Sequence, residues 1–211
     1  MSTLAQLVEP TKPQHTPPPR VADLGNGDYV DVVFYHGDGD PQASRAIPWF
    51  WQKLMADDLL KLYYPSDTER SFCTFAKMVS SPVTRVLMVV VKDPNGDVKD
   101  FMGLATYEPL QFGPALVGHA GFIFLKDYWH REVTLAAGRR IMQAWFEEFP
   151  EPRLDIAVGI IAKDNIMANR YVQALGWTRV GELPGCQQYA GEQCDAVLWQ
   201  ITKEKFERGG V

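Results

Sequence analysis

Hydrophobic and polar positions are most sharply patterned over residues 153–181. This stretch opens with a nearly continuous apolar run at 154–162, rich in Ile and Val, which predicts a strand that is covered on both faces. Polar residues at 163–165 end the run, and Asp164 or Asn165 is placed to cap the N-terminus of a helix. The pattern therefore predicts a buried strand that leads into a capped helix.

The segment after this cap has the spacing of an amphipathic helix. Its apolar side chains recur at intervals of three and four positions, at Ala168, Tyr171, Val172 and Leu175. Gly176 follows where a left-handed C-terminal residue is favoured, and an extended pattern resumes at 177–180. The whole unit is predicted to be strand, helix and strand.

The rest of the chain alternates between extended and helical patterns. Apolar runs predict strands at 29–35, 84–91, 100–107, 115–125 and 196–202. Amphipathic spacing predicts helices at 44–63, at 66–78 with a cap in residues 66–69, and within 126–146. This order of elements predicts an α/β fold around one core.

Residues 1–28 differ in composition from the chain that follows. They hold a third of the fifteen prolines, and they end in a Gly25-Asn26-Gly27 sequence. Such a segment buries too little apolar surface to offset the entropy lost on ordering, so we expect an extended or disordered arm. The predicted folded domain is 29–211.

Composition and charge exclude several classes of protein. The net charge of −5 argues against nucleic acid as the main partner. No apolar run approaches the roughly 18 residues of a membrane span, and the N-terminus lacks the pattern of a secretory signal. Three cysteines without metal-binding spacing favour reduced thiols in a cytoplasmic protein, although a bridge between Cys186 and Cys194 stays open.

The strand–helix–strand unit also carries a sequence motif. Asn165-x-x-Ala168, followed by Leu175-Gly176-Trp177, resembles the second motif of the GNAT acyltransferase superfamily, N-x-x-[AS] followed by L-G-[FW]. The resemblance extends over residues 29–207 and is strongest over 156–181. It implies an α/β fold with a GNAT-like twisted mixed sheet and helices on both faces.

The resemblance implies acetyl-CoA as a cofactor. In the family, backbone groups of one strand bind the pantetheine arm, and a glycine-rich loop before the next helix binds the diphosphate. The corresponding strand residues here are Phe122, Ile123, Phe124 and Leu125, and the corresponding loop residues are Arg131, Val133 and Thr134. Asn165 is placed either to contact the cofactor arm or simply to cap its helix.

The loop departs from the family pattern R-G-x-G-x-A. Its counterpart, residues 129–134, contains no glycine, and His130 and Glu132 stand at the glycine positions. Because glycine permits close approach of the backbone to phosphate, positive charge has to compensate here. Arg131, with Arg139 and Arg140, can supply part of that charge by direct pairing. The other interpretation of these residues is an ordinary capped helix with a solvated basic face.

An enzyme of this family also needs a base that takes a proton from the amine. His119 lies two residues before Gly121, where related transferases often carry glutamate, and a neutral imidazole suits the role near neutral pH. A structural role on the strand is the other interpretation of His119. The family's proton-donating tyrosine corresponds to Val172, so the neighbouring Tyr171 is either a candidate acid or a packing residue.

Three functions fit these observations. The leading hypothesis is an acyl-CoA-dependent N-acyltransferase that acetylates a small-molecule or protein amine. The alternative is a non-catalytic GNAT-fold binding or assembly protein, similar to some phage structural components, and exposed aromatic residues at Trp49 and Trp51 favour it. The third is a transferase with another donor, such as an aminoacyl group. We expect no metal site, and a sheet edge near the C-terminus is compatible with a homodimer.

Overall fold

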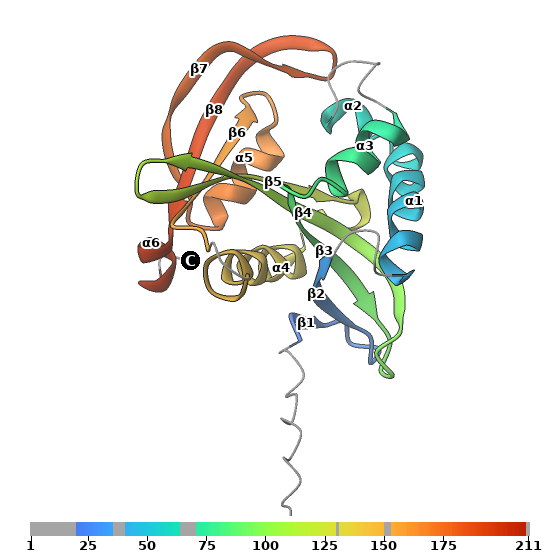
Figure 1. Cartoon of the computed structure of the whole chain (residues 1–211). Helices are drawn as coiled ribbons and strands as arrows, with labels where there is room; N and C mark the ends of the chain where they lie inside the picture. Colours follow the sequence, from blue (N-terminus) through green and yellow to red (C-terminus); the bar gives the residue numbers. More distant parts are fainter. Residues whose placement is uncertain (1–19, 36–40, 64–70, 130, 150–152, 210–211) are drawn as a thin grey trace, which may run out of the picture.

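The computed structural model describes residues 20–35, 41–63, 71–129, 131–149 and 153–209. Their centre is an eight-stranded sheet in the order β1-β2-β3-β4-β5-β6-β8-β7 (Figure 1). β5 and β6 run parallel, whereas every other neighbouring pair is antiparallel. The predicted mixed sheet is therefore confirmed.

Each predicted strand is present, and one more precedes them. The strands are β1 (Ala22–Asp23), β2 (Tyr29–Tyr35), β3 (Arg85–Lys92), β4 (Val98–Phe112), β5 (Ala115–Phe124), β6 (Ile156–Ala162), β7 (Thr178–Tyr189) and β8 (Glu192–Thr202). β4, β7 and β8 are longer than predicted, because antiparallel pairing in the β4–β5 and β7–β8 hairpins continues beyond the apolar runs.

The helices lie between these strands along the chain. They are α1 (Pro41–Ala56), α2 (Leu60–Tyr63), α3 (Phe72–Val79), α4 (Glu132–Gln143), α5 (Ile166–Ala174) and α6 (Lys203–Glu207), together with a 3-10 turn η1 (Lys126–Tyr128) and a π-helical turn η2 (Ala144–Glu148). None of the helices in the described part of the chain is long and apolar enough to cross a membrane.

Helices cover both faces of the sheet, as predicted. α4 and α5 pack on one face and contribute Ile141 and Val172 to a first buried cluster. α1 and α3 pack on the other face, where Phe50 belongs to a second cluster. The neighbouring β3 residues Val89 and Val90 point into the first and the second cluster respectively, because successive strand residues face opposite sides.

The first long helical pattern forms two helices instead of one. Asp58 adopts a φ of +55° between α1 and α2, and this conformation cannot continue an α-helix. α1 begins at Pro41, so that Pro48 lies inside the helix and not in its first turn. α3 is capped by the Ser71 hydroxyl, while the predicted cap at 66–69 lies outside the described residues.

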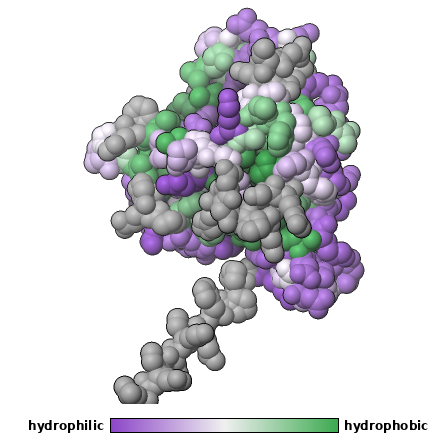
Figure 2. All heavy atoms as spheres, turned by 45° about the vertical axis from the view of Figure 1, so that its right-hand side comes forward, coloured by the Kyte–Doolittle hydropathy of each residue, from purple (hydrophilic) through white to green (hydrophobic). Residues whose placement is uncertain are grey.

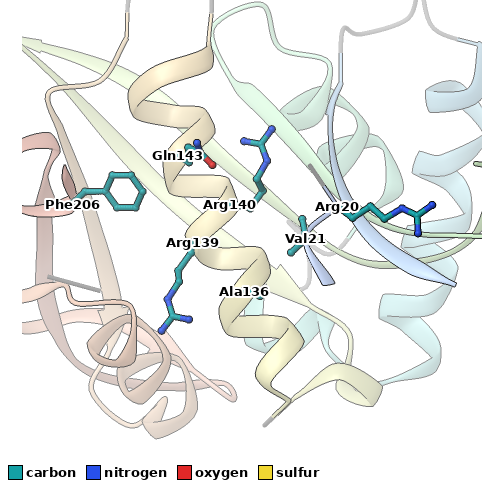
Figure 3. Close-up of a pocket in the computed structure, with 7 residues that line it drawn as sticks. All are labelled: Arg20, Val21, Ala136, Arg139, Arg140, Gln143 and Phe206. Atoms are coloured by element: carbon teal, nitrogen blue, oxygen red, sulfur yellow. The ribbon is translucent and has the colours of Figure 1, made fainter. Parts of the chain in front are cut away.

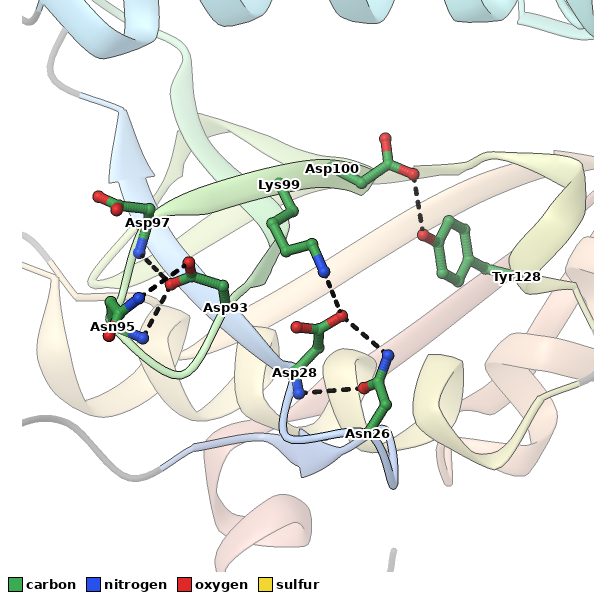
Figure 4. A network of polar contacts seen from close by, with 8 residues as sticks. All are labelled: Asn26, Asp28, Asp93, Asn95, Asp97, Lys99, Asp100 and Tyr128. Atoms are coloured by element: carbon green, nitrogen blue, oxygen red, sulfur yellow. Dashed lines mark hydrogen bonds and ion pairs between the residues drawn. The ribbon is translucent and has the colours of Figure 1, made fainter.

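Part of the segment predicted as an arm belongs to the fold. β1 adds an edge strand to the sheet by pairing with β2. The Asp28 carboxylate is buried, and it accepts hydrogen bonds from Lys99 Nζ at 2.7 Å and from Asn26 Nδ2 at 2.9 Å (Figure 4). These contacts order residues 20–28, so the fold begins before the predicted boundary. Residues 1–19 lie outside the described residues.

Two predictions about exposure are wrong. β6 is not covered on both faces: Ala157 is buried in the first cluster, whereas Ile160, which points to the other face, is 37% exposed. The aromatic residues predicted to be exposed pack inside. Trp51 is only 6% exposed, and Trp49 is half-buried against another aromatic ring. The three cysteines are free thiols, so no bridge joins the two on the β7–β8 hairpin.

Candidate active site

The parallel strands β5 and β6 separate inside the sheet. They pair at only three positions, and the last of these joins His119 to Val158. β5 nevertheless continues to residue 124 and β6 to residue 162, so the two strands diverge beyond His119 (Figure 1). We call this segment the β5–β6 divergence. It interrupts the hydrogen-bond ladder in the middle of the sheet.

Alternate residues of β5 direct their backbone groups toward this divergence. The Leu125 N–H points to β4 and donates to the Met102 carbonyl at 3.0 Å. The Ile123 carbonyl also points to β4, where it lies beside Gly103. Strand alternation therefore turns the backbone of Phe122 and Phe124 toward β6. The Phe124 carbonyl accepts the indole N–H of Trp129 at 2.8 Å. Of the four strand residues predicted to hold a cofactor arm, two thus face β4 and two face the divergence.

The N-terminus of α4 follows β5 after η1. Arg131 is the N-cap residue, and no side chain caps the helix. Its guanidinium lies 5.6 Å from the ring centroid of Tyr128. Glu132 places an exposed carboxylate in the first turn, where it complements the helix dipole and disfavours a bound anion. Thr134 donates its hydroxyl to the Tyr128 carbonyl and its N–H to the Arg131 carbonyl, and the Val133 side chain packs against the first cluster, so of these two residues Val133 can offer its backbone N–H to a ligand.

Two hydrogen bonds fix the loop between β5 and α4. The Tyr128 hydroxyl donates to the Asp100 carboxylate of β4 at 3.3 Å (Figure 4). The Lys126 N–H donates to the Asp57 carboxylate at 3.3 Å. Burial, and then the neighbouring Asp100 carboxylate, raises the pKa of Tyr128 to about 12. The phenol therefore stays protonated at neutral pH and ties the loop to β4.

His119 lies on the face of the sheet that α1 and α3 cover elsewhere. Ile123, which shares its face of β5, packs against the second cluster. Glu108 of β4 is directly opposite His119, so their side chains share that face. The buried Thr84 hydroxyl donates to the Glu108 carboxylate at 3.1 Å. Both His119 and Glu108 are exposed, which gives a solute access to an imidazole beside an anchored carboxylate.

Tyr171 lies in the interface between α4, α5 and β5. Its ring packs against Phe122 and Phe124, each at a centroid distance of 5.5 Å, and its hydroxyl donates to the Thr134 carbonyl at 3.1 Å. Burial raises the pKa of Tyr171 well above its usual range. Tyr171 and His119 lie on opposite faces of the sheet, so the structure does not bring these two predicted residues together.

Asn165 caps α5, which is one of the two roles predicted for it, helix capping and contact with the cofactor arm. Its side-chain oxygen accepts the Ala168 N–H at 3.1 Å. Asn169, one turn further on, donates to the Ala162 carbonyl at 2.9 Å and accepts the Trp199 indole N–H at 2.8 Å. These bonds fix the start of α5 to the end of β6. Contact between Asn165 and a cofactor stays a prediction.

A cavity of about 400 Å³ lies elsewhere, along α4 between β1 and α6 (Figure 3). Arg20, Arg139 and Arg140 contribute to its lining, and none of its described lining residues belongs to β5 or β6. Arg140 is held by Glu148 through two hydrogen bonds of 2.8 and 2.7 Å, and Arg20 lies over the Tyr29 ring at 4.1 Å. The Arg140 guanidinium is therefore already paired, and the expectation that it helps to compensate for the missing glycines stays a prediction.

Sequence reasoning missed several residues of this site. Thr84 and Glu108 stand at the ends of two apolar strand patterns, where a polar residue is ordinary. Trp129 and Asn169 gave no local signal, because their partners are distant backbone or side-chain groups. The only sequence signal for any of them was that Glu108 directly follows a predicted strand. That signal does not indicate a partner, because only the β4–β5 register places Glu108 opposite His119.

Solved structures with the same fold are known. The spermidine N-acetyltransferase of Vibrio cholerae, solved in complex with CoA and spermine, is 14% identical to this chain, with a TM-score of 0.62 over 84% of this chain and 98% of that one. A GNAT-family acetyltransferase from Bacillus anthracis is 16% identical, with a TM-score of 0.60 over 82% of this chain and 95% of that one. No protein-family model matches the sequence, and no curated protein matches it.

These similarities show that the chain has the GNAT fold, as the motif around Asn165 implies. This chain shares its fold, a mixed sheet with helices on both faces, with these two acetyltransferases. At these low identities the similarity extends to the fold and not to the substrate. Neither structure supports the alternative of a phage structural component.

Proposed function

We propose that this protein is an acyl-CoA-dependent N-acyltransferase that transfers an acetyl group to an amine. One observation carries the proposal: an exposed imidazole, that of His119, stands at the last paired position before β5 and β6 diverge in a GNAT fold. The similar enzyme from Vibrio cholerae was solved with CoA and with an amine, which supports this donor and this class of acceptor.

The β5–β6 divergence fits an extended arm that contains amide groups. Phe122 directs its N–H and carbonyl toward β6 at a level where the two strands no longer pair. An extended ligand can hydrogen-bond to such groups as an added strand would. The Phe124 carbonyl is already bonded to the Trp129 indole, so we assign the arm chiefly to Phe122.

The N-terminus of α4 fits a diphosphate. The helix has no side-chain cap, and unpaired first-turn N–H groups attract anions. We assign the diphosphate to the first-turn backbone N–H groups before Thr134, chiefly that of Val133, with the exposed guanidinium of Arg131 beside them, because the Thr134 N–H already donates to the Arg131 carbonyl. Glu132 opposes the binding of an anion, so the affinity is expected to be moderate.

His119 acts in this proposal as the general base. When bound, an acyl-CoA supplies an activated acyl group held in a thioester. The His119 imidazole takes a proton from the ammonium group of the acceptor, which leaves a neutral, nucleophilic amine. Exposure of His119 gives the acceptor a path from solvent. Tyr171 lies on the opposite face with its hydroxyl bonded to Thr134, and we assign it a packing role.

Calorimetric titration of the purified protein with acetyl-CoA and, separately, with CoA tests this proposal. We expect micromolar binding of both, followed by release of free thiol when an amine is added. No detectable binding at high concentration would overturn the proposal. It would favour the non-catalytic role or an aminoacyl donor, since the carboxylate of Glu132 and the absence of glycine in 129–134 already disfavour a diphosphate.

The proposal also includes a cytoplasmic location and a homodimer. Three free thiols are typical of a reducing compartment. β7 is one of the two edge strands of the described sheet and offers a long edge to a second copy. Size-exclusion chromatography with light scattering measures the molar mass and so tests whether the protein is a dimer.

A further inference from the structure

We propose that the uncovered sheet surface beside His119 binds the acceptor, and that this acceptor is a primary amine attached to a single apolar group. This inference rests on the proposed function, and it goes beyond it by naming the class of amine. It excludes a linear polyamine as the preferred acceptor.

The surface consists of apolar side chains on three neighbouring strands. We call it the acceptor surface and define it by Val158, Ile160, Leu183 and Leu198. Leu198 of β8 is paired with Ile160 of β6, and Leu183 of β7 lies one strand further out. Ile160 and Leu183 are 37% and 36% exposed. Figure 2 shows one face of the molecule, on which apolar and polar residues are mixed.

The helix layer stops short of this surface. The second cluster, which α1 and α3 form with the sheet, contains residues of β3, β4 and the end of β5, and none of its described members comes from β6, β7 or β8. On the opposite face, Ala157, Val197 and Trp199 are buried under α4 and α5. One face of β6 and β8 is therefore packed, whereas on the other face Ile160 is exposed, Val158 and Leu198 are half-buried, and burial is complete only at the Ala162–Ala196 pair. Exposed apolar surface of this kind marks a binding site.

The acceptor surface is continuous with the candidate base. Val158 is paired with His119 across the last position of the β5–β6 ladder, so the two side chains share a face. Ile160 follows two residues later on the same side of β6. An acceptor that rests on Ile160 and Leu198 therefore reaches the imidazole without crossing the sheet.

One anchored carboxylate stands at the edge of this apolar surface. Glu108 is opposite His119 on β4, and the buried Thr84 hydroxyl holds its carboxylate at 3.1 Å. A primary amine is an ammonium ion near neutral pH, and a carboxylate attracts it. Glu108 thus supplies the position for the ammonium, while His119 beside it accepts the proton. No further covalent step is involved.

The Glu108 carboxylate and the acceptor surface together favour an acceptor that carries one positive charge and one apolar group. The sheet order places β5 between Glu108 and β6, so a linear polyamine that sets its first ammonium at Glu108 would lay a later ammonium on the apolar side chains of β6 and β8. Desolvation of an unpaired charge on apolar side chains is costly, whereas each buried methylene group is favourable. The surface therefore fits an alkylamine better than spermidine of similar length.

A series of alkylamines tests the inference. Butylamine, hexylamine and octylamine are compared with spermidine as acceptors, and their direct binding is measured by calorimetry without any cofactor. We expect kcat/KM to rise about three- to fourfold for each added methylene until the surface is filled. Ile160→Asp should raise KM for octylamine about tenfold. Ile166→Asp is the matched control, because Ile166 is also exposed, at 59%, but belongs to α5 on the other face.

The outcomes separate this inference from the proposed function. Turnover that prefers spermidine, or that is unchanged by Ile160→Asp, overturns the inference and leaves the transferase in place. Octylamine binding that Ile160→Asp abolishes, without turnover by acetyl-CoA, supports the inference and overturns the proposed function. A wild-type dimer that Ile160→Asp dissociates would show that the surface is an interface between two copies, and that result also overturns the inference.

Discussion

The phenol of Tyr171 lies directly over Gly138 of α4, so close that a methyl group on the glycine would overlap its hydroxyl. The same methyl group would stand 2.7 Å from Leu175 Cδ1. This contact lets α4 and α5 approach closely, and it lies one turn from Thr134, whose carbonyl accepts the Tyr171 hydroxyl. The glycine is thus needed for packing and not for its backbone conformation.

Gly138→Ala should destabilise the protein by about 1–3 kcal/mol, because overpacking exceeds the gain in helix propensity. Denaturant unfolding measures the change. Tyr171→Phe removes the overlapping oxygen, so the double variant should lose less stability than the sum of the two single changes. Additive losses would show that Leu175 alone carries the clash.

Tyr128→Phe should reduce the loss of stability at alkaline pH. The pKa of Tyr128 is about 12 in the folded protein, raised from about 10 in the unfolded chain. A raised pKa contributes stability that is present below pH ~10 and is lost as the pH rises toward 12. Thermal unfolding between pH 9 and 12 should show a shallower decline for the variant than for the wild type. If stability declined equally steeply with pH in the variant and the wild type, the raised pKa of Tyr128 would be contradicted.

Two substitutions at Asn165 separate capping from cofactor contact. Asn165→Ala should cost about 1 kcal/mol, because the Ala168 N–H loses its acceptor. Asn165→Ser keeps an oxygen for the cap and should be nearly as stable as the wild type. If calorimetry shows that Asn165→Ser binds CoA as the wild type does, Asn165 serves the helix alone. A large loss of affinity in this variant would assign it to the cofactor arm.

His119→Ala should lower kcat by about 10²–10⁴-fold while the fold stays intact, since general-base catalysis contributes a factor of that size. Circular dichroism and the unfolding midpoint check the fold, and CoA titration checks that donor binding is unchanged. His119 is exposed, so its removal leaves no cavity. Turnover equal to that of the wild type would remove the base assigned to His119.

Glu132→Gln should tighten CoA binding about two- to fivefold, because it removes a negative charge from the first turn of α4. Glu192→Gln is the control: it makes the same change of net charge at an exposed site on the β7–β8 turn. The gain should shrink at high salt, as expected for an exposed charge. Equal effects of the two substitutions would place the diphosphate away from α4.

Local chemistry was sufficient to predict several elements. The Asn165 cap, the helix after it and the left-handed Gly176, with a φ of +78°, all followed from residue type and spacing. These features depend on neighbours within a few positions along the chain. The break at Asp58 was missed, because the apolar spacing continues through it and only the backbone turns.

Contacts between distant segments could not be predicted in the same way. A run of Ile and Val predicts a strand but does not state which layers cover it, so the exposed face of Ile160 was missed. Residues 20–28 belong to the fold although they were predicted to be part of an arm. This was missed for a similar reason, because Lys99, which pairs with Asp28, lies far along the chain.

The sequence by itself determined the succession of strands and helices and the cap at Asn165, because periodicity and capping act through nearby residues, and the motif around Asn165 implied the GNAT fold by resemblance. Only the tertiary structure decided that His119 faces Glu108, that Tyr171 lies on the other side of the sheet, and that α1 and α3 leave β6 uncovered. Strand register and the placement of layers set these relationships. Both are fixed by packing over the whole sheet, and no short stretch of sequence contains them.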